Sequence, residues 1–279
     1  MGALVVSALA ILYRDVVVEL VRVWSTDDYS SHGFLIPPIA AFLAWERRDR
    51  FRTAPMQPAA AGLLLAVASI LTLAPGVPVF LTRVSIVSAI AAVVLLLFGW
   101  SRLRAVAFPL AILLLMVPLP AAVFERLEFP LRMATSGMSE ALIRAANIPV
   151  TRDGNLLDLG NIVLEVAREC SGIRSTIALV TIGLVFGYVP ESRTWQRLLV
   201  AALTIPVVIV TNSIRVAATA VSTHYYGPGA ATGFVHDLYG WLAFGLAFGT
   251  LFMIHRFVLR IASARRPRTL APPLESPNT

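Results

Sequence analysis

Long runs of hydrophobic residues, separated by short polar segments, make up most of the chain. A membrane-spanning helix needs about 20 mostly apolar residues, and the pattern predicts eight such spans. Their approximate bounds are 2–13, 33–46, 59–75, 80–100, 103–120, 171–189, 196–215 and 237–258. The first run has no basic segment before it and no small-residue cleavage site after it, so we interpret it as a retained helix.

The segment between the fifth and sixth predicted spans has a different pattern. Residues 121–147 combine hydrophobic residues at helical spacing with Arg and Glu, which is typical of an amphipathic helix lying on the outer membrane interface. Residues 148–167 alternate as short strands, and Asp153-Gly154 predicts the turn of a β-hairpin. The predicted fold is an all-α integral membrane protein with this one short hairpin on its outer face. Residues 1–260 form its single membrane domain, and the Pro-rich residues 261–279 form a disordered cytoplasmic tail.

The composition agrees with a membrane protein. Hydrophobic residues make up 57% of the chain and charged residues 14%, and the mean hydropathy is +0.78, whereas soluble domains are about one quarter charged. All 23 basic residues are arginines, and they lie in short groups between apolar runs. A nucleic-acid-binding protein would gather them on one exposed face, so we expect no nucleic-acid partner. A single cysteine excludes an internal disulfide, no Cys/His spacing suggests a zinc site, and we expect neither a metal nor a cofactor.

The arginines also predict the orientation in the membrane. They cluster after the second, fourth, sixth and eighth predicted spans, within residues 47–52, 102–104, 193–197 and 256–268. If the eight predicted spans alternate in direction, these clusters share one side, and the positive-inside rule places that side, with both termini, in the cytoplasm. The outer side then receives residues 27–33, 121–170 and 216–236.

Cys170, the only cysteine, lies between Glu169 and Arg174 at the start of the sixth predicted span. A helix N-terminus and a nearby cation both favour the thiolate, and Arg174 shares the helical face of Cys170 because it follows four residues later. Glu169 opposes this effect unless it pairs with an arginine elsewhere. Most buried cysteines behave as small hydrophobic residues, so a structural role is the alternative to an activated nucleophile.

Two further polar sites are predicted at the same membrane face. Asn212 and Arg215 lie three residues apart near the outer end of the seventh span, where an arginine is costly unless it faces protein or water. Arg215 is either a side chain that extends to the lipid headgroups or a guanidinium that binds a carboxylate or an oxyanion. His236 begins the eighth span, where it is either part of an aromatic belt with Tyr239 and Trp241 or an acid/base.

Cys170, Arg215 and His236 together provide the groups that acyl transfer needs: a nucleophile, an oxyanion stabiliser and a proton carrier. They occur in this order on three successive predicted spans. Each has an ordinary structural interpretation by itself, but their common placement at one membrane face favours an enzyme.

Three motifs resemble the exosortase/archaeosortase family of multi-span membrane transpeptidases. They are ECSGIRS at 169–175, NSIR at 212–215 and the histidine at 236, in this order. The stretch DYSSHGFLIP at 28–37 also resembles a signature of that family, with one extra serine at position 30 or 31. The resemblance covers about residues 1–260, nearly the whole chain.

The resemblance implies an enzyme that recognises a C-terminal sorting signal on secreted proteins, made of a short motif such as Pro-Glu-Pro, a membrane span and a basic cluster. Such an enzyme cleaves near the motif through a cysteine thioester and transfers the protein to an acceptor. By position, Cys170 would be the nucleophile, Arg215 would stabilise the oxyanion and His236 would move the proton. The residues expected to bind or position the substrate are Arg168, Arg174 and Asn212.

The expected location is the bacterial cytoplasmic (inner) membrane, with the active site at the outer, periplasmic face. The expected partners are secreted proteins that carry the sorting signal, together with membrane lipid; the sequence does not identify the acceptor. Two alternatives stay open. One is an intramembrane cysteine protease that uses water as the acceptor. The other is a non-enzymatic transporter or lipid-binding protein in which Arg215 and His236 line a polar path.

Overall fold

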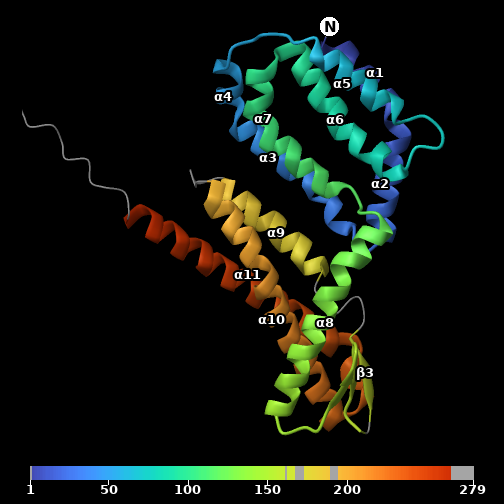
Figure 1. Ribbon diagram of the computed structural model, residues 1–279, viewed down its shortest axis with the longest axis vertical. Coiled ribbons are helices and arrows are strands. Elements are labelled where there is room, and N and C mark those ends of the chain that lie inside the picture. The colour runs from blue at the N-terminus through green and yellow to red at the C-terminus, as the bar shows by residue number, and fades with distance from the viewer. Residues whose placement is uncertain (1, 161, 167–172, 189–193, 265–279) are drawn as a thin grey trace, which may run out of the picture. The chain divides into compact units, whose positions relative to one another are not determined.

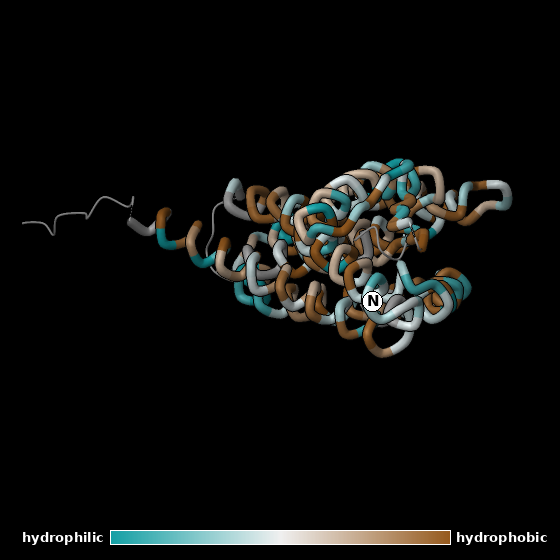
Figure 2. The backbone as a smooth tube through the Cα atoms, turned by 90° about the horizontal axis from the view of Figure 1, so that it is seen from below, coloured by the Kyte–Doolittle hydropathy of each residue, from teal (hydrophilic) through white to brown (hydrophobic). Residues whose placement is uncertain are grey.

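The computed structural model describes residues 2–160, 162–166, 173–188 and 194–264. The chain divides into two compact units, Met1–Leu127 and Glu128–Thr279. Both units are mostly helical (Figure 1), and hydrophobic positions recur along the helices of each (Figure 2). The helix α11 of the second unit includes positions 261–264 of the predicted tail; positions 265–279 lie outside the described residues.

The first unit consists of helices joined by short turns. Its α-helices are α1 (Gly2–Leu12), α2 (Arg14–Thr26), α3 (Ile36–Glu46), α4 (Arg48–Thr53), α5 (Ala61–Leu71), α6 (Val79–Phe98) and α7 (Trp100–Leu113), and its 3₁₀ helices are η1 (Ser31–Phe34) and η2 (Leu114–Met116). Helix α8 (Ala121–Ala145) begins in this unit and continues into the second. Helices α5 and α6 pack closely, because Gly62 has no side chain to meet the backbone of Leu96.

The second unit combines a small sheet with three long helices. Its elements after α8 are β1 (Thr151–Asp153), β2 (Leu156–Asp158), β3 (Val163–Glu165), α9 (Ile173–Tyr188), α10 (Thr194–Tyr226), η4 (Pro228–Ala231) and α11 (Gly233–Ala264). The strands are antiparallel in the order β1-β2-β3, and the sheet lies beside the C-terminal part of α8 (Figure 1). Helices α9 and α11 both pack against α10.

Three helices in the described part of the chain are long and apolar enough to cross a membrane: Val79–Phe98, Leu198–Tyr226 and Gly233–Ile261. A fourth results if Trp100–Met116 and Ala121–Ala145 count as one span. The prediction of eight spans is therefore not supported. Helices α1, α3 and α5 have 11 residues each, which gives about 16 Å against a hydrocarbon core of about 30 Å. The chain is nevertheless an integral membrane protein of mostly helical fold.

The predicted β-hairpin is present, but its turn is shifted by one residue and a third strand extends it. Asp153 pairs with Leu156, so Gly154 and Asn155 form the turn in place of Asp153-Gly154. Gly154 has φ +60°, a conformation that glycine adopts without the steric penalty of a side chain.

Helix α10 is longer than the predicted span at 196–215. The residues after Arg215 contain neither glycine nor proline until Gly227, so the helix continues to Tyr226. Gly227 ends it with φ +84° and donates its N–H to the carbonyl of Thr223 at 2.9 Å, as a glycine after a helix commonly does. The 3₁₀ helix η4 then packs back against α10 before α11 begins.

The stretch DYSSHGF at 28–34 includes the 3₁₀ helix η1, which precedes α3 and, like the end of α2, is hydrogen-bonded to η2. Trp24 donates its indole N–H to the carbonyl of Met116 at 2.9 Å, and His32 Nε2 lies 3.0 Å from the carbonyl oxygen of Leu115. Gly33 is buried against the Trp24 ring, where an added Cβ would overlap the indole. In this unit the stretch therefore has a structural role.

We predict that Gly33→Ala destabilises the protein. The new Cβ forces Trp24 away from Met116, and overpacking of this kind costs about 1–3 kcal/mol. Thermal unfolding of the purified protein in detergent measures the effect. Gly137→Ala is the matched control, because its Cβ would meet only Arg152 Cζ, at 4.0 Å, and alanine is favoured over glycine inside a helix. Equal melting temperatures for Gly33→Ala and the unsubstituted protein would contradict the prediction.

Candidate active site

Arg215 of α10 and His236 in the first turn of α11 contact each other directly. Arg215 Nη2 lies 2.8 Å from His236 Nε2. A guanidinium is only a donor, so Nε2 accepts this hydrogen bond, and the imidazole is the neutral tautomer with its proton on Nδ1. The arginine therefore selects one tautomer of the histidine and occupies its basic lone pair.

Each member of this pair also has a second buried polar atom. Arg215 Nε and His236 Nδ1 have no hydrogen-bond partner within the described part of the chain. Buried donors of native proteins are almost always paired with protein, water or ligand. These two N–H groups therefore mark a place where a polar ligand can bind.

A cavity of about 90 Å³ opens beside the pair. Its walls come from α10, α11 and β3: Arg215, Val216, Thr219, His236, Leu164, Glu165 and Val166. A site for one water molecule needs about 10–15 Å³ by the same measure. The cavity is thus large enough for a group of several atoms, such as a peptide carbonyl with its neighbours.

Gly240 allows the guanidinium to lie against α11. A Cβ at this position would be 3.5 Å from Arg215 Nη2 and 3.6 Å from its Cζ. Gly240 follows His236 by four residues, so both lie on the same face of the helix, and together they form the surface that receives Arg215. Beside them Ser222 of α10 and Tyr239 of α11 share a hydrogen bond of 2.7 Å, which holds the two helices together at this level.

The sheet is fixed on α10 by a small hydrophobic core. The buried residues of this core are Ile143, Ile148, Val150, Leu157, Leu159, Val166, Val216, Ala217 and Ala220. Its members on α10 directly follow Arg215 in sequence. Packing of the strands against this part of α10 therefore places β3 at the edge of the cavity.

Asn155 fixes the end of β3. Its side-chain amide lies 3.2 Å from Glu165 Oε1 and 3.3 Å from the carbonyl oxygen of Val166. Its own carbonyl accepts the N–H of Val166 at 2.8 Å. Glu165 and Val166 are therefore held in place at the cavity wall.

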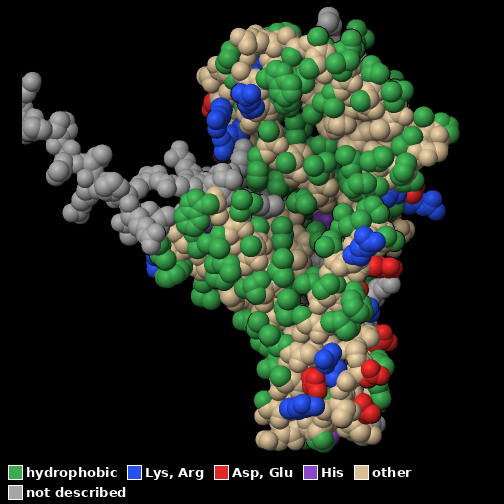
Figure 3. Space-filling model, viewed as in Figure 1, with side chains coloured by type: hydrophobic (Ala, Val, Ile, Leu, Met, Phe, Trp, Pro, Cys, Tyr) green, Lys and Arg blue, Asp and Glu red, His purple; other side chains and the backbone are tan. Residues whose placement is uncertain are grey.

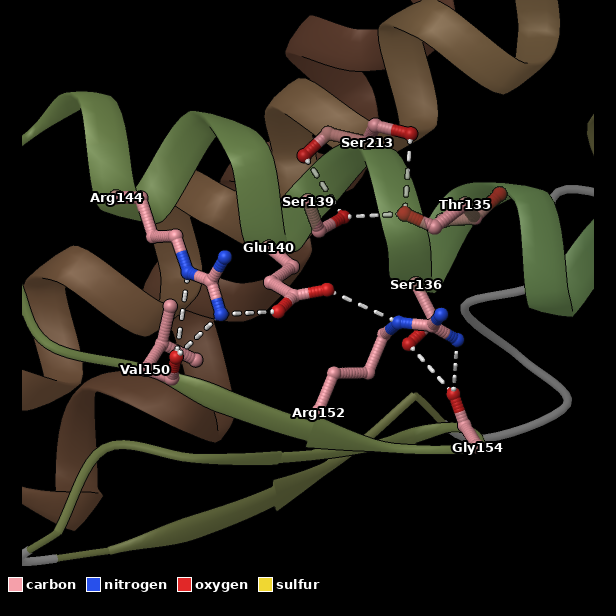
Figure 4. Close-up of polar contacts among 9 residues, drawn as sticks. All are labelled: Thr135, Ser136, Ser139, Glu140, Arg144, Val150, Arg152, Gly154 and Ser213. Carbon is pink, nitrogen blue, oxygen red and sulfur yellow. Dashed lines mark hydrogen bonds and ion pairs between the residues drawn. The ribbon is translucent and has the colours of Figure 1, made fainter.

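Buried hydroxyl groups connect α8 to α10 (Figure 4). Ser139 Oγ lies 2.7 Å from the carbonyl oxygen of Thr135 and 3.3 Å from that of Ser213, and Ser213 Oγ lies 3.3 Å from the Thr135 carbonyl oxygen. The helix predicted at 121–147 is thus present as α8, but part of its polar face, with Thr135 and Ser139, is buried against α10. Small hydroxyl side chains permit this close approach.

A charged cluster connects α8 to β1 in the same view (Figure 4). Glu140 pairs with Arg144 at 2.7 Å and with Arg152 at 3.0 Å. Arg144 also donates to the carbonyl of Val150, and Arg152 to that of Gly154. The strand is therefore anchored to the helix by charged groups, and Ser136 of α8 adds a hydrogen bond to the Gly154 carbonyl at 3.0 Å.

The protein-family comparison identifies the chain over most of its length. The model of the transmembrane exosortase family matches residues 24–253. The chain belongs to this family. No curated protein and no solved structure matches it. The matched region of this exosortase includes the pair Arg215–His236, the sheet and the stretch at 28–37.

Of the six predicted site residues of this exosortase, four belong to described helices and two lie outside the described residues. It brings Arg215 and His236 together, as the common membrane face predicts. Asn212 is buried on α10, three residues before Arg215. Arg174 belongs to the first turn of α9, but the structure does not describe its side chain. The two others, Arg168 and Cys170, lie outside the described residues.

Two residues of the site were not predicted from the sequence. The spacing of four residues places Gly240 on the helical face of His236, but its role depends on contact with Arg215 of another helix. Glu165, which lines the cavity from β3, gives no such signal, because its position depends on how the sheet packs against α10. Among the described residues, no group of three or more His, Cys, Asp or Glu side chains is placed to hold a metal ion.

We predict that His236 is a neutral imidazole protonated at Nδ1 and that Arg215→Ala releases it from this single tautomer. Nitrogen-15 NMR of histidine-labelled protein in micelles measures the tautomer, because the protonated and unprotonated ring nitrogens have different chemical shifts. The His236 signal is assigned by its loss in His236→Gln, with His224→Gln as the matched control. A proton on Nε2 in the unsubstituted protein would contradict the geometry of the pair.

Proposed function

We propose that this exosortase is a cysteine transpeptidase that cleaves a C-terminal sorting signal from secreted proteins and transfers them to an acceptor. The observation that supports the proposal best is the pair Arg215–His236 at 2.8 Å, facing a cavity that β3 closes. An oxyanion stabiliser and a proton carrier thereby meet at one place. The proposed nucleophile, Cys170, follows the last residue of the cavity wall by four positions.

Chain length alone keeps this cysteine within reach of the cavity. Val166 lines the cavity, and four residues of fully extended chain span at most about 14 Å. A nucleophile at position 170 can therefore approach a carbonyl group held by Arg215.

The first half of the proposed reaction forms a thioester. The carbonyl oxygen of the scissile amide recruits the Arg215 guanidinium, which frees Nε2 of His236 to take the thiol proton of Cys170. The thiolate sulfur bonds to the carbonyl carbon, and the resulting oxyanion is stabilised by the guanidinium. The C–N bond then breaks, and the imidazolium returns its proton to the departing amine.

The second half transfers the acyl group. An incoming nucleophile gives its proton to His236 Nε2 and bonds to the thioester carbon. The C–S bond breaks, and the imidazolium returns the proton to the departing thiolate, which regenerates Cys170. In this proposal Arg168 and Arg174 bind a carboxylate of the sorting motif, such as the glutamate of Pro-Glu-Pro, and Asn212 orients Arg215. The proposed location is the bacterial cytoplasmic membrane with the site at its outer face, because Arg197 near the start of α10 and Arg256 near the end of α11 lie at the helix ends opposite to Arg215 and His236.

We predict that Cys170→Ala abolishes processing and that Arg215→Ala lowers its rate about 10²–10³-fold, the usual effect of removing one oxyanion donor. His236→Ala removes the proton carrier and lowers the rate about 10²–10⁴-fold. The assay follows cleavage of a tagged protein from the same genome that ends in a motif, one apolar span and an arginine cluster.

Membrane levels of each variant, measured by immunoblotting, must equal those of the unsubstituted protein. Arg215→Lys is the matched control for charge, because lysine keeps the cation but loses the planar donor set. Normal processing by Cys170→Ala would exclude a cysteine enzyme and favour a transporter or lipid-binding protein. Mass spectrometry of the product separates the two enzymes, since a free carboxylate as the only product would mean hydrolysis.

We also predict that Gly240→Val lowers processing while Gly245→Val does not. The branched side chain at position 240 overlaps the Arg215 guanidinium, which a Cβ alone would approach to 3.5 Å. Gly245 lies on the same helix, and a Cβ there would meet no described atom within 4 Å. The same processing assay measures both variants, and equal loss in the two would indicate a general effect on α11.

A further inference from the structure

An apolar groove of about 570 Å³ lies within the first unit, between α3, α4, α6 and α7. Small residues of α3, Ala41 and Ala44, face larger ones such as Val94 of α6 and Leu110 of α7 across it. The lining is apolar except at α4, where Arg48 and Arg52 contribute the only charged side chains among the described residues that line it. Figure 3 shows basic side chains gathered at α4 on a face that is otherwise largely hydrophobic.

The two arginines have little competition from acidic groups. The only ion pair formed by Arg48 within the described residues is with Asp49, at the long distance of 4.0 Å, and the Asp49 side chain is 77% exposed. The Arg52 guanidinium has no ion pair with any described residue. A surface ion pair of this kind is weak. Arg48 also donates to the carbonyl of Trp45 at 3.1 Å and lies over the Trp45 ring at 4.4 Å, but a guanidinium has five N–H donors, so both cations can still bind an external anion.

Helix α4 is held in a fixed position at the end of the groove. Arg102 of α7 donates its Nε–H to the carbonyl of Ala54 at 3.2 Å, and its guanidinium lies over the rings of Phe51 and Phe98 at 5.3 and 5.5 Å. These two rings contact each other edge to face at 5.4 Å. The cationic end of the groove is therefore built before any ligand binds.

The groove is shorter than one leaflet of a bilayer and fits within it. Its lining residues extend from Pro37 to Ala44 on α3 and from Val106 to Leu113 on α7, about 10 Å along each helix at 1.5 Å per residue. One leaflet contributes half of a hydrocarbon core of about 30 Å. The groove can therefore hold the part of an acyl chain nearest to its headgroup.

We infer that this groove binds one anionic phospholipid, with an acyl chain along α3 and α7 and the phosphate at Arg48 and Arg52. The positive charge of Arg48 and Arg52 favours a lipid over a substrate span as the ligand of the groove. A substrate span that ends in a basic cluster would meet cations of the same sign, whereas the phosphate of an anionic lipid complements them. The site lies within the first unit and does not depend on the proposed chemistry at Cys170.

Native mass spectrometry tests this inference. The full-length protein is released from vesicles of equal parts phosphatidylglycerol and phosphatidylcholine, and the retained lipids are identified. We expect preferential retention of one phosphatidylglycerol and a loss of about fivefold in affinity for each arginine removed in Arg48→Ala and Arg52→Ala. Arg50→Ala is the matched control, since it removes one charge from the same helix at a position that does not line the groove.

A second variant tests the apolar part separately. Ala41→Phe fills the groove while both arginines stay, and it should also lower retention of phosphatidylglycerol. The inference is wrong if Arg50→Ala has the same effect as Arg48→Ala, or if Ala41→Phe has none, because either result means attraction to surface charge alone. Displacement of the lipid by a peptide of one apolar span followed by arginines would assign the groove to a substrate instead.

Discussion

The guanidinium of Arg215 is the constraint on which the arrangement of the second unit depends. It cannot lose its charge, and it lies within Leu198–Tyr226, a helix apolar enough to cross a membrane. An arginine at the centre of such a helix costs about 2.5–3.5 kcal/mol on insertion scales. The protein offsets part of this cost with an acceptor, His236 Nε2, and with Gly240, which lets the planar group lie against α11.

The same constraint explains why a sheet is attached to a helical membrane protein. A charged group in an apolar helix needs a polar cavity, and such a cavity needs walls that exclude lipid. Strand β3 and the residue after it provide one wall through Leu164, Glu165 and Val166. Its position is set by an apolar core against α10 and by the ion pairs of Glu140 that connect β1 to α8. Helix α8 is in turn joined to α10 through buried hydroxyl groups. The position of β3 relative to Arg215 is therefore set by contacts with α10, made directly or through α8.

Part of this arrangement could be predicted from the sequence. Arg215 and His236 stand out because charged and titratable groups are rare within apolar runs, and their predicted common face is consistent with the observed contact. Asp153-Gly154 predicted the presence of the hairpin. The position of its turn, one residue later, depends on which residues pair across the strands. The number of spans was not predictable, since an apolar run shows burial in lipid or protein but not the length of the helix. The role of Gly240 was also hidden, because it depends on a side chain from another helix.

The observed contact has a consequence for the order of events in the proposed reaction. His236 can act as a base only through Nε2, since its proton is on Nδ1, and that lone pair is occupied by Arg215. The lone pair of the base is therefore occupied while no substrate is bound, whereas the Nε–H of Arg215 has no partner among the described residues. A carbonyl oxygen that draws Nη2 away satisfies the guanidinium and frees the lone pair in one step. In this proposal the base becomes competent only when the group to be attacked is in place, so the thiolate of Cys170 forms only with its substrate bound.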